Sequence, residues 1–422
     1  MGSTITEKIL AGHSGQQTVR PGDLVFSQID LVLSLDIGTG PVIEIFDQMG
    51  ATKVFDPEKV VMVNDHFVPA KDIASAELSR TMRLFARDQQ LSHYFEVGRS
   101  GICHLLLMER GLALPGQVII GGDSHTCTSG AVGAFAVGVG NSDLAASMAL
   151  GEIWLRVPET IRVLFTGNLP EFVCGKDLIL LVLKELGIEG ARYKTLEFAG
   201  EAVEHLPMSD RITLCNMAAE TGAKNAIIEA DGVTVDFLKE QGISADDMDM
   251  PRSDGDATYA DSLAFSVSDL EPLVAVPSLP SNVKRVGEVT GVKVDQVLIG
   301  SCTNGSLADF RRASRILKGR KVHEAVRLIA IPGTPKILSR MIEEGIAQIL
   351  LDAGAAIGPS TCGPCLGGHM GVLAAHEVAL ATTNRNFVGR MGHTSSQVYL
   401  ASPAVAAATA ILGRIADPRE LA

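Results

Sequence analysis

The chain has 422 residues, of which 46% are hydrophobic and 20% charged, and its formal net charge is −13. This composition is typical of a soluble globular protein with two or three domains, and its acidic balance, with no basic patch to offset it, disfavours nucleic acid as a partner. No apolar run is long enough to span a membrane and the N-terminus has no secretory core, so we expect a cytoplasmic protein without membrane contact.

The first part of the chain alternates between helical and strand patterns. This alternation predicts α/β layers in which the strands are largely buried. Strands are expected within 59–69 and 117–130, and helices over 76–91 and 142–155, with a further helix ending at Gly50. Both strands run into polar or glycine-rich segments, where a parallel sheet would present functional side chains.

The remainder of the chain divides at two changes of pattern. A strand at 161–167 and a helix at 175–187 indicate a boundary near residue 165. The stretch 242–285 is acidic, turn-rich and spaced by prolines, which is typical of a connecting segment on the surface. The strand–loop–helix pattern then resumes at 294–305. We therefore expect an α/β domain over 1–165, a smaller α/β domain with its connecting segment over 166–285, and a third α/β domain over 286–422.

Three loops share a weak likeness: "IIGGDSHT", "VLIGSCTN" and "AAIGPSTC". Each begins as a short apolar strand and continues into glycine and small polar residues. In open α/β sheets, ligands bind outside the carboxyl ends of the strands. The likeness therefore predicts three α/β units whose strand ends point toward one central cleft.

Seven cysteines occur in the chain, and three of them lie in glycine-rich loops. Cys362 and Cys365 form a C-x-x-C within "GPSTCGPCLGG", and Cys302 lies in "IGSCTNG". A thioredoxin-like dithiol, a zinc site and an iron–sulfur site with three thiolates are all open, although zinc lacks a second cysteine or histidine pair. The isolated Cys103, Cys174 and Cys215 are expected to be small core residues, since disulfides are rare in a reducing compartment.

Acidic and imidazole side chains follow two of the predicted strands. Asp65 and His66 occur in "NDHFVP", and Asp123 and His125 occur in "GDSHT". Each pair alone is explained by a turn or loop whose polar groups satisfy one another. Together in one cleft, paired carboxylates and imidazoles are what general acid–base chemistry requires.

Four further polar residues have weaker signals. His104 lies in an apolar helical setting, where a buried core histidine is the simpler explanation. Glu197 lies on an apolar strand, where a lone carboxylate is costly without a partner. Arg385 and Arg390, in "TTNRNFVGRMGH", could bind a dicarboxylate through bidentate pairs, although two surface arginines would look the same.

Four motifs together resemble those of the aconitase family of iron–sulfur hydro-lyases: "GDSHT", "IGSCTNG", "GPSTCGPCLGG" and "NRNFVGRMG" occur in that family's order, and the resemblance covers nearly the whole chain. It implies an aconitase-like α/β fold with three units around a central cleft. It also implies that Cys302, Cys362 and Cys365 hold one [4Fe–4S] cluster, in which one iron has no protein ligand.

The same resemblance implies roles for the polar residues. Acid–base or orienting pairs near the substrate hydroxyl would be Asp65 with His66, Asp123 with His104, and His125 with Glu197. Asn384, Arg385 and Arg390 would bind the substrate carboxylate and the surroundings of the cluster. Pro41 departs from the family pattern, because it stands where aconitase has a substrate-binding glutamine, and this weakens the case for citrate as the substrate.

Aconitase proper carries an additional C-terminal swivelling domain, and this chain ends where that domain would begin. The chain therefore resembles the separate large subunits of the isopropylmalate isomerase and homoaconitase branch. This implies a small partner subunit that supplies a serine base, and a small 2-hydroxy dicarboxylic acid as substrate. Isopropylmalate, in leucine biosynthesis, is the expected substrate, with 2,3-dimethylmalate, citramalate and homoaconitate as alternatives. Outside this class, an RNA-binding regulator is disfavoured by the acidic charge, and a thiol redox protein would leave Cys302 and the arginines unexplained.

Overall fold

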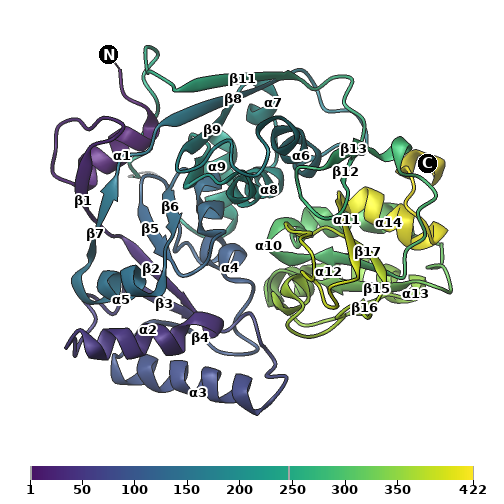
Figure 1. The fold of residues 1–422 in the computed structure, drawn as a ribbon, viewed down its shortest axis with the longest axis horizontal. Helices are drawn as coiled ribbons and strands as arrows, with labels where there is room; N and C mark the ends of the chain where they lie inside the picture. The colour runs from purple at the N-terminus through teal and green to yellow at the C-terminus, as the bar shows by residue number, and fades with distance from the viewer. Residues whose placement is uncertain (1, 246–247, 422) are drawn as a thin grey trace.

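The computed structural model describes residues 2–245 and 248–421. Two lateral parts, one around a five-stranded and one around a seven-stranded sheet, are bridged by a four-stranded sheet (Figure 1). A two-stranded antiparallel ribbon, β1 (Leu24–Gln28) with β7 (Glu152–Arg156), and α1 (Ile5–His13) lie at the outer edge of the N-terminal part. None of the helices in the described residues is long and apolar enough to cross a membrane.

The five-stranded sheet is entirely parallel, in the order β4-β3-β2-β5-β6. Every residue of β2 and β3 is buried, which is typical of parallel strands covered by helices on both faces. The strands are β2 (Leu31–Leu35), β3 (Val60–Val63), β4 (His93–Phe95), β5 (Val118–Gly121) and β6 (Phe135–Gly138), and the helices are α2 (Asp36–Gln48), α3 (Ile73–Asp88), α4 (Cys103–Glu109) and α5 (Asn141–Leu150).

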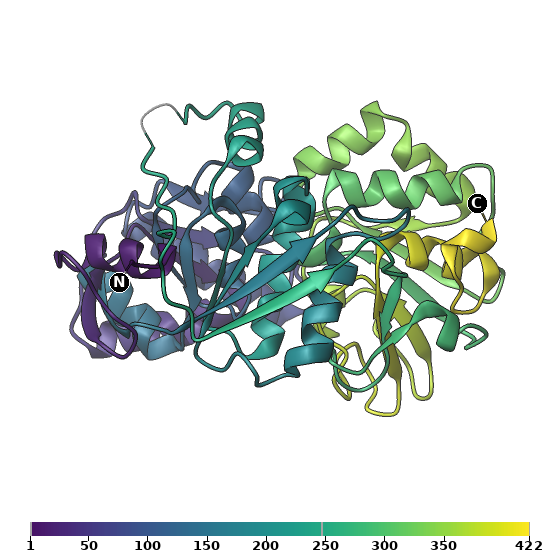
Figure 2. The ribbon, with the colours of Figure 1, turned by 90° about the horizontal axis from the view of Figure 1, so that it is seen from above.

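The four-stranded sheet is also parallel, in the order β10-β9-β8-β11, and β8 and β11 run side by side across the molecule (Figure 2). Its strands are β8 (Thr160–Thr166), β9 (Thr195–Ala199), β10 (Asn225–Ile227) and β11 (Asp261–Ser266), and its helices are α6 (Gly175–Leu186), α7 (Glu201–Glu204), α8 (Met208–Ala218) and α9 (Gly232–Glu240). A short 3₁₀ helix, η2 (Ala219–Thr221), continues α8.

The seven-stranded sheet has the order β13-β12-β18-β17-β14-β15-β16; β12 is antiparallel to both of its neighbours, β13 and β18, and the other pairs are parallel. Its strands are β12 (Leu273–Ala275), β13 (Val283–Arg285), β14 (Gln296–Gly300), β15 (Arg327–Ile331), β16 (Ala356–Ile357), β17 (Val378–Ala381) and β18 (Gln397–Ala401). Its helices are α10 (Ser301–Asn304), α11 (Leu307–Leu317), α12 (Pro335–Glu343), α13 (Ile346–Ala353) and α14 (Pro403–Leu412).

One buried apolar cluster contains residues of all three larger sheets, among them Leu33, Phe165 and Leu298. The three sheets therefore share a core, and the loops at their edges are held against one another. The α/β fold with units around a central cleft agrees with the sequence-based prediction. The division at residues 165 and 285 stays a prediction: residue 165 lies within β8, and β12 and β13 already belong to the third sheet.

Two expected elements differ from the structure. The helix expected over 142–155 ends at Leu150, because Gly151 adopts a left-handed conformation (φ 72°) that ends the helix, and β7 follows. The segment 242–285, expected to be a surface connection, contributes β11, β12 and β13. β11 is an edge strand whose side chains are exposed or only half-buried, so its polar sequence resembles a loop.

Candidate functional site

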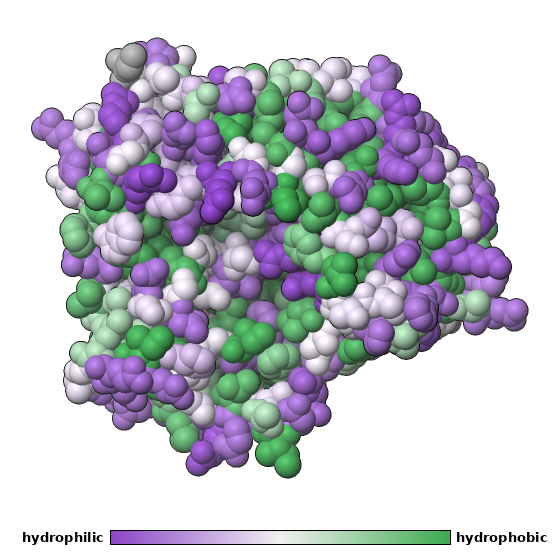
Figure 3. Space-filling view, in the orientation of Figure 1, coloured by the Kyte–Doolittle hydropathy of each residue, from purple (hydrophilic) through white to green (hydrophobic). Residues whose placement is uncertain are grey.

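A cavity of about 310 Å³ lies where the carboxyl ends of parallel strands from the five-stranded and seven-stranded sheets meet. Every predicted site residue except Glu197 lines it. The space-filling view is hollowed between the two lateral parts, with polar residues in the hollow (Figure 3). The loops after β3 and β5 enter from one side, and those after β14, β16 and β17 enter from the other. The three similar loops predicted to share a cleft therefore do so.

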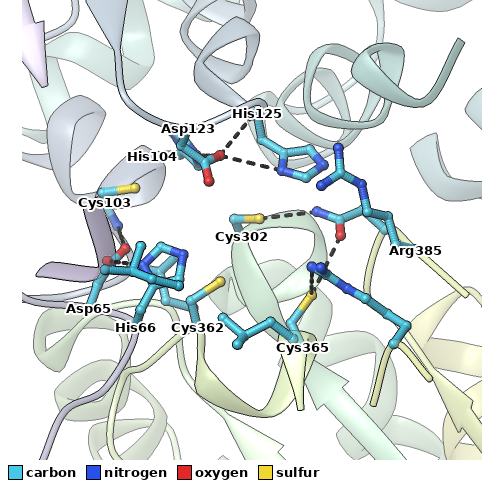
Figure 4. Close-up of a pocket in the computed structure, with 15 residues that line it drawn as sticks. Asp65, His66, Cys103, His104, Asp123, His125, Cys302, Cys362, Cys365 and Arg385 are labelled. Carbon is cyan, nitrogen blue, oxygen red and sulfur yellow. Dashed lines mark hydrogen bonds and ion pairs between the residues drawn. The ribbon is translucent and has the colours of Figure 1, made fainter. Parts of the chain in front are cut away.

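The three cysteines of the glycine-rich loops lie together in this cavity (Figure 4). The loop that carries Cys302 leaves β14 at Gly300. The φ of 140° at this position requires glycine, since a Cβ there would collide with the carbonyl oxygen of Ile331. Cys362 follows β16, and its backbone N–H donates to the carbonyl of Asp65 at 2.6 Å. The cysteine loop and the segment after β3 are thus fixed to one another.

Polar groups surround the sulfur atoms. Asn384 Nδ2 donates to Cys302 Sγ at 3.4 Å, and an Arg390 guanidinium nitrogen donates to Cys365 Sγ at 3.5 Å. Hydrogen bonding from Cys362 lowers the pKa of the Cys302 thiol to about 6 and also lowers the pKa of Cys365, where Arg390 acts in the same direction. The same hydrogen bonds raise the pKa of the Cys362 thiol well above its usual range. The environment therefore favours the thiolate, the form that ligates metals, at Cys302 and Cys365.

Asp65 and His66 are paired as predicted, with His66 Nδ1 2.6 Å from Asp65 Oδ1. The second carboxylate oxygen of Asp65 accepts the backbone N–H of Cys103 at 2.9 Å, which fixes its orientation. Burial alone would lower the pKa of His66. The negative charges of Asp65 and Asp36 raise it by more than burial lowers it, so the net shift of the pKa is well upward. His66 is therefore held as an imidazolium, a group able to donate a proton.

Asp36, which the sequence analysis did not single out, organises this corner of the cavity. Its carboxylate accepts backbone N–H groups of His66 at 3.0 Å and Phe67 at 2.8 Å, and lies 3.6 Å from His66 Nδ1. Asp36 directly follows the buried strand β2, as Asp65 and Asp123 follow their strands closely. That shared position is the sequence signal that could have identified it.

A second network connects His104, Asp123 and His125. His104 Nε2 lies 2.9 Å from Asp123 Oδ1, and the backbone N–H of His125 donates to the same oxygen at 2.7 Å. The pairing of Asp123 with His104 matches the prediction. Burial opposes ionisation of Asp123, yet hydrogen bonds from the two histidines hold its pKa well below the usual range.

The predicted pairing of His125 with Glu197 is wrong. His125 Nε2 lies 2.7 Å from Glu220 Oε1 instead, and Glu220 also binds Arg385, with Nε 2.8 Å from Oε1. Glu197 lies on β9, where its carboxylate accepts hydrogen bonds from Ser253 at 2.8 Å and Tyr259 at 2.7 Å. The carboxylate of Glu197 is therefore hydrogen-bonded away from the cavity. The reason is that β9 belongs to the four-stranded sheet, whose strand ends do not line the cavity.

Glu220 is a second functional residue, after Asp36, that sequence reasoning missed. It lies in η2, four residues after Asn216 at the end of α8, and both are buried. The preceding helix also carries Asp210, Arg211 and Thr213, so no local pattern singles out Glu220. Burial lowers the pKa of His125, but hydrogen bonds to Asp123 and Glu220 dominate and raise it to about 10.

The arginines differ in how they are held. Arg385 is fixed by Glu220 and by a hydrogen bond of 2.9 Å to Ser124 Oγ. Arg390 donates to Cys365 through one nitrogen, while its buried Nε has no hydrogen-bond partner in the described part of the chain. Arg390 nevertheless lines the cavity, where its guanidinium lies beside Cys365.

The family model for aconitase (aconitate hydratase) matches residues 7–413. The chain is 55% identical over 421 residues to a 3-isopropylmalate dehydratase large subunit of Moorella thermoacetica, with 100% of both chains covered. The chain belongs to the aconitase family. It is also 54% identical over 422 residues to the same-named protein of Heliobacterium modesticaldum, with 100% of both chains covered. Among solved structures, aconitase X of Thermococcus kodakaraensis aligns with a TM-score of 0.48 and 12% identity, covering 86% of this chain and 84% of that one.

Membership of the aconitase family makes the chain a hydro-lyase and implies a [4Fe–4S] cluster. The donors in the cavity fit such a group: three cysteine sulfurs line one buried space, and soft thiolates are the usual ligands of iron–sulfur clusters. Hydrogen-bond donors from Asn384 and Arg390 already reach two of those sulfurs. Cys302, Cys362 and Cys365 are therefore the residues that would hold it.

Proposed function

We propose that this chain is the large subunit of a dehydratase that interconverts 2-isopropylmalate and 3-isopropylmalate. The observation that carries the proposal is the 55% identity over the full length of a relative named 3-isopropylmalate dehydratase large subunit. The site supports the same reaction class, because it combines a three-cysteine cavity, two histidine–carboxylate networks and two arginines.

When bound through the three cysteines, the cluster supplies one iron without a protein ligand, a Lewis acid that makes the substrate hydroxyl a better leaving group. In our proposal His66, held protonated beside Asp65, donates a proton to that leaving oxygen. The His104–Asp123 pair orients the same region. The proton on the neighbouring carbon goes to a serine of a small partner subunit, and water returns with the opposite regiochemistry.

Arg385 and Arg390 bind the carboxylates of the substrate in this proposal. Arg385 is pre-oriented by Glu220 and Ser124, so little side-chain freedom is lost on binding. Arg390 lines the same cavity and donates to Cys365 Sγ through one nitrogen, so its guanidinium lies next to the cysteines. Fixing the carboxylates aligns the hydroxyl-bearing carbon with the proton donor, and such positioning contributes several kcal/mol to catalysis.

The relatives' name, large subunit, supports a separate small subunit as partner. We also propose that the enzyme acts in the cytoplasm, because its seven cysteines are all free thiols, as expected in a reducing compartment.

The proposal is tested with the anaerobically reconstituted chain and a small subunit of the same class. Turnover is followed by the absorbance of the unsaturated intermediate for isopropylmalate, 2,3-dimethylmalate, citramalate and homocitrate. We expect the highest kcat/KM with isopropylmalate, and a loss of at least about 100-fold in His66→Asn. A cluster-loaded complex that turns over another diacid, but not isopropylmalate, would contradict the substrate assignment.

A further inference from the structure

Lys176, at the start of α6, is a fully buried lysine that the proposed mechanism does not use. Its ammonium donates hydrogen bonds to the carbonyl oxygens of Thr382 at 2.9 Å and Thr383 at 2.5 Å. Within the described residues, none of the ion pairs involves Lys176, and both of its hydrogen-bond acceptors are main-chain carbonyls. A buried cation of this kind costs several kcal/mol of desolvation unless other groups compensate its charge.

The two carbonyls place Lys176 directly behind the cysteine cavity. Thr382 Oγ1 accepts the backbone N–H of Gly300 at 2.9 Å and donates to the Gly300 carbonyl at 3.1 Å, two residues before Cys302. Thr383 precedes Asn384, whose amide donates to Cys302 Sγ. Lys176 therefore supports, through one layer of main chain, both the loop that presents Cys302 and the turn that presents Asn384.

Three of the four groups that favour a charged Lys176 are cysteines, and the fourth is a carboxylate. Burial lowers the pKa of its ammonium to about 8, while Cys174, Cys365, Asp309 and Cys302 act in the opposite direction. The carboxylate of Asp309 is already engaged, since it accepts from Ser306 Oγ at 2.6 Å and Asn304 Nδ2 at 3.1 Å. A cluster held by three thiolates carries net negative charge, so it is the group best suited to compensate the buried ammonium.

We propose that Lys176 is a positioning residue that places a buried positive charge behind the cluster, raising its reduction potential, and fixes the Thr382–Thr383 turn that carries Asn384. The proposal rests on the proposed function, because it needs the cluster held by the three cysteines. The potential of an iron–sulfur cluster depends on nearby charge and hydrogen bonding, so loss of the ammonium makes reduction harder.

The test compares Lys176→Met, which removes both charge and donors, with Lys176→Gln, which removes the charge but keeps amide donors. Lys224→Met is the control, because Lys224 is partly buried and, like Lys176, donates to a main-chain carbonyl, that of Gly138 at 3.2 Å, but has no thiol among its charged neighbours. Iron, acid-labile sulfide and urea unfolding are measured for each anaerobically reconstituted full chain. The reduction potential is then determined by titration, followed through the electron paramagnetic resonance signal of the reduced cluster.

We expect both Lys176 variants to titrate at a more negative potential than the parent and Lys224→Met. An unchanged reduction potential in a Lys176→Gln chain with full iron content would overturn the proposal. A potential that shifts in Lys176→Met but not in Lys176→Gln would also overturn it, because the effect would then come from hydrogen bonding and not from the charge. Cluster loss in a Lys176→Gln chain that unfolds like the parent supports a role for the charge, whereas cluster loss together with unfolding would make the role purely structural and overturn it. A parent chain that binds no cluster would instead refute the proposed function itself.

Discussion

Replacement of Glu220 by glutamine removes the carboxylate that binds both His125 and Arg385. Glutamine has the same shape, but its amide carries half the acceptor capacity and no charge. His125 Nε2, now 2.7 Å from a carboxylate oxygen, would face a neutral group, and Arg385 would lose its charged partner. We therefore expect the substitution to destabilise the protein without changing the volume of the site.

The magnitude follows from the pKa of His125. Its rise from 6.5 to about 10 corresponds to roughly 5 kcal/mol at about 1.4 kcal/mol per unit, and Asp123 and Glu220 share responsibility for it. Glu220 acts through one charged hydrogen bond, and such bonds contribute about 1.5–3 kcal/mol. We expect Glu220→Gln to lower the free energy of unfolding by about 2–3 kcal/mol near pH 6.5.

The pH dependence gives the sharper test. A histidine whose folded pKa is raised stabilises the fold fully below its unfolded pKa of 6.5, and this contribution is lost as the pH rises through about 10. The difference between parent and variant should therefore shrink between pH 6.5 and pH 10. Urea unfolding of the two full chains across this range measures it, with the exposed Glu201→Gln as control. A difference that stays constant with pH would refute the assigned role of His125.

Three further substitutions test other parts of the account. Gly300→Ala should lower the free energy of unfolding by about 2 kcal/mol, because it forces a Cβ into the left-handed region against Ile331; Gly287→Ala, where the Cβ meets open space, is the control in the same urea experiment. Glu197→Gln should keep kcat/KM within about twofold and cost about 1 kcal/mol of stability, since its partners lie away from the cavity; a 100-fold loss of activity would restore it to the site. Arg385→Lys should lower kcat/KM by about 10- to 100-fold in steady-state assays, because an ammonium cannot reproduce its planar contacts, and parent-like kinetics would contradict its role in binding.

The residues that line the cavity as the sequence predicts are placed there by features of their local sequence. Asp65 with His66, and Asp123 with His125, follow buried parallel strands within four residues, so the fold rule for strand ends brings them together. The glycine-rich setting of Cys302 likewise has a local reason in the backbone of Gly300.

The residues that were missed or misplaced depend on packing between distant segments. Glu220 reaches His125 only because α8 packs against the 3₁₀ helix η1 (Thr126–Val132) that follows His125. Glu197 has the same apolar-strand signal as a site residue, but the position of β9 in the bridging sheet directs it to Ser253 and Tyr259 instead. A local sequence pattern predicts neither the sheet to which a strand belongs nor the segment against which a helix packs.

The most direct test of the account is the iron and acid-labile sulfide content of the anaerobically purified full chain, compared with Cys302→Ser. Cys215→Ser, which alters a buried cysteine that does not line the cavity, is the matched control. We predict about four iron and four sulfide per chain in the parent and control, and loss of both in Cys302→Ser. A parent chain without iron after anaerobic reconstitution, or a Cys302→Ser chain with full cluster and activity, would contradict the three-cysteine site on which the proposed reaction depends.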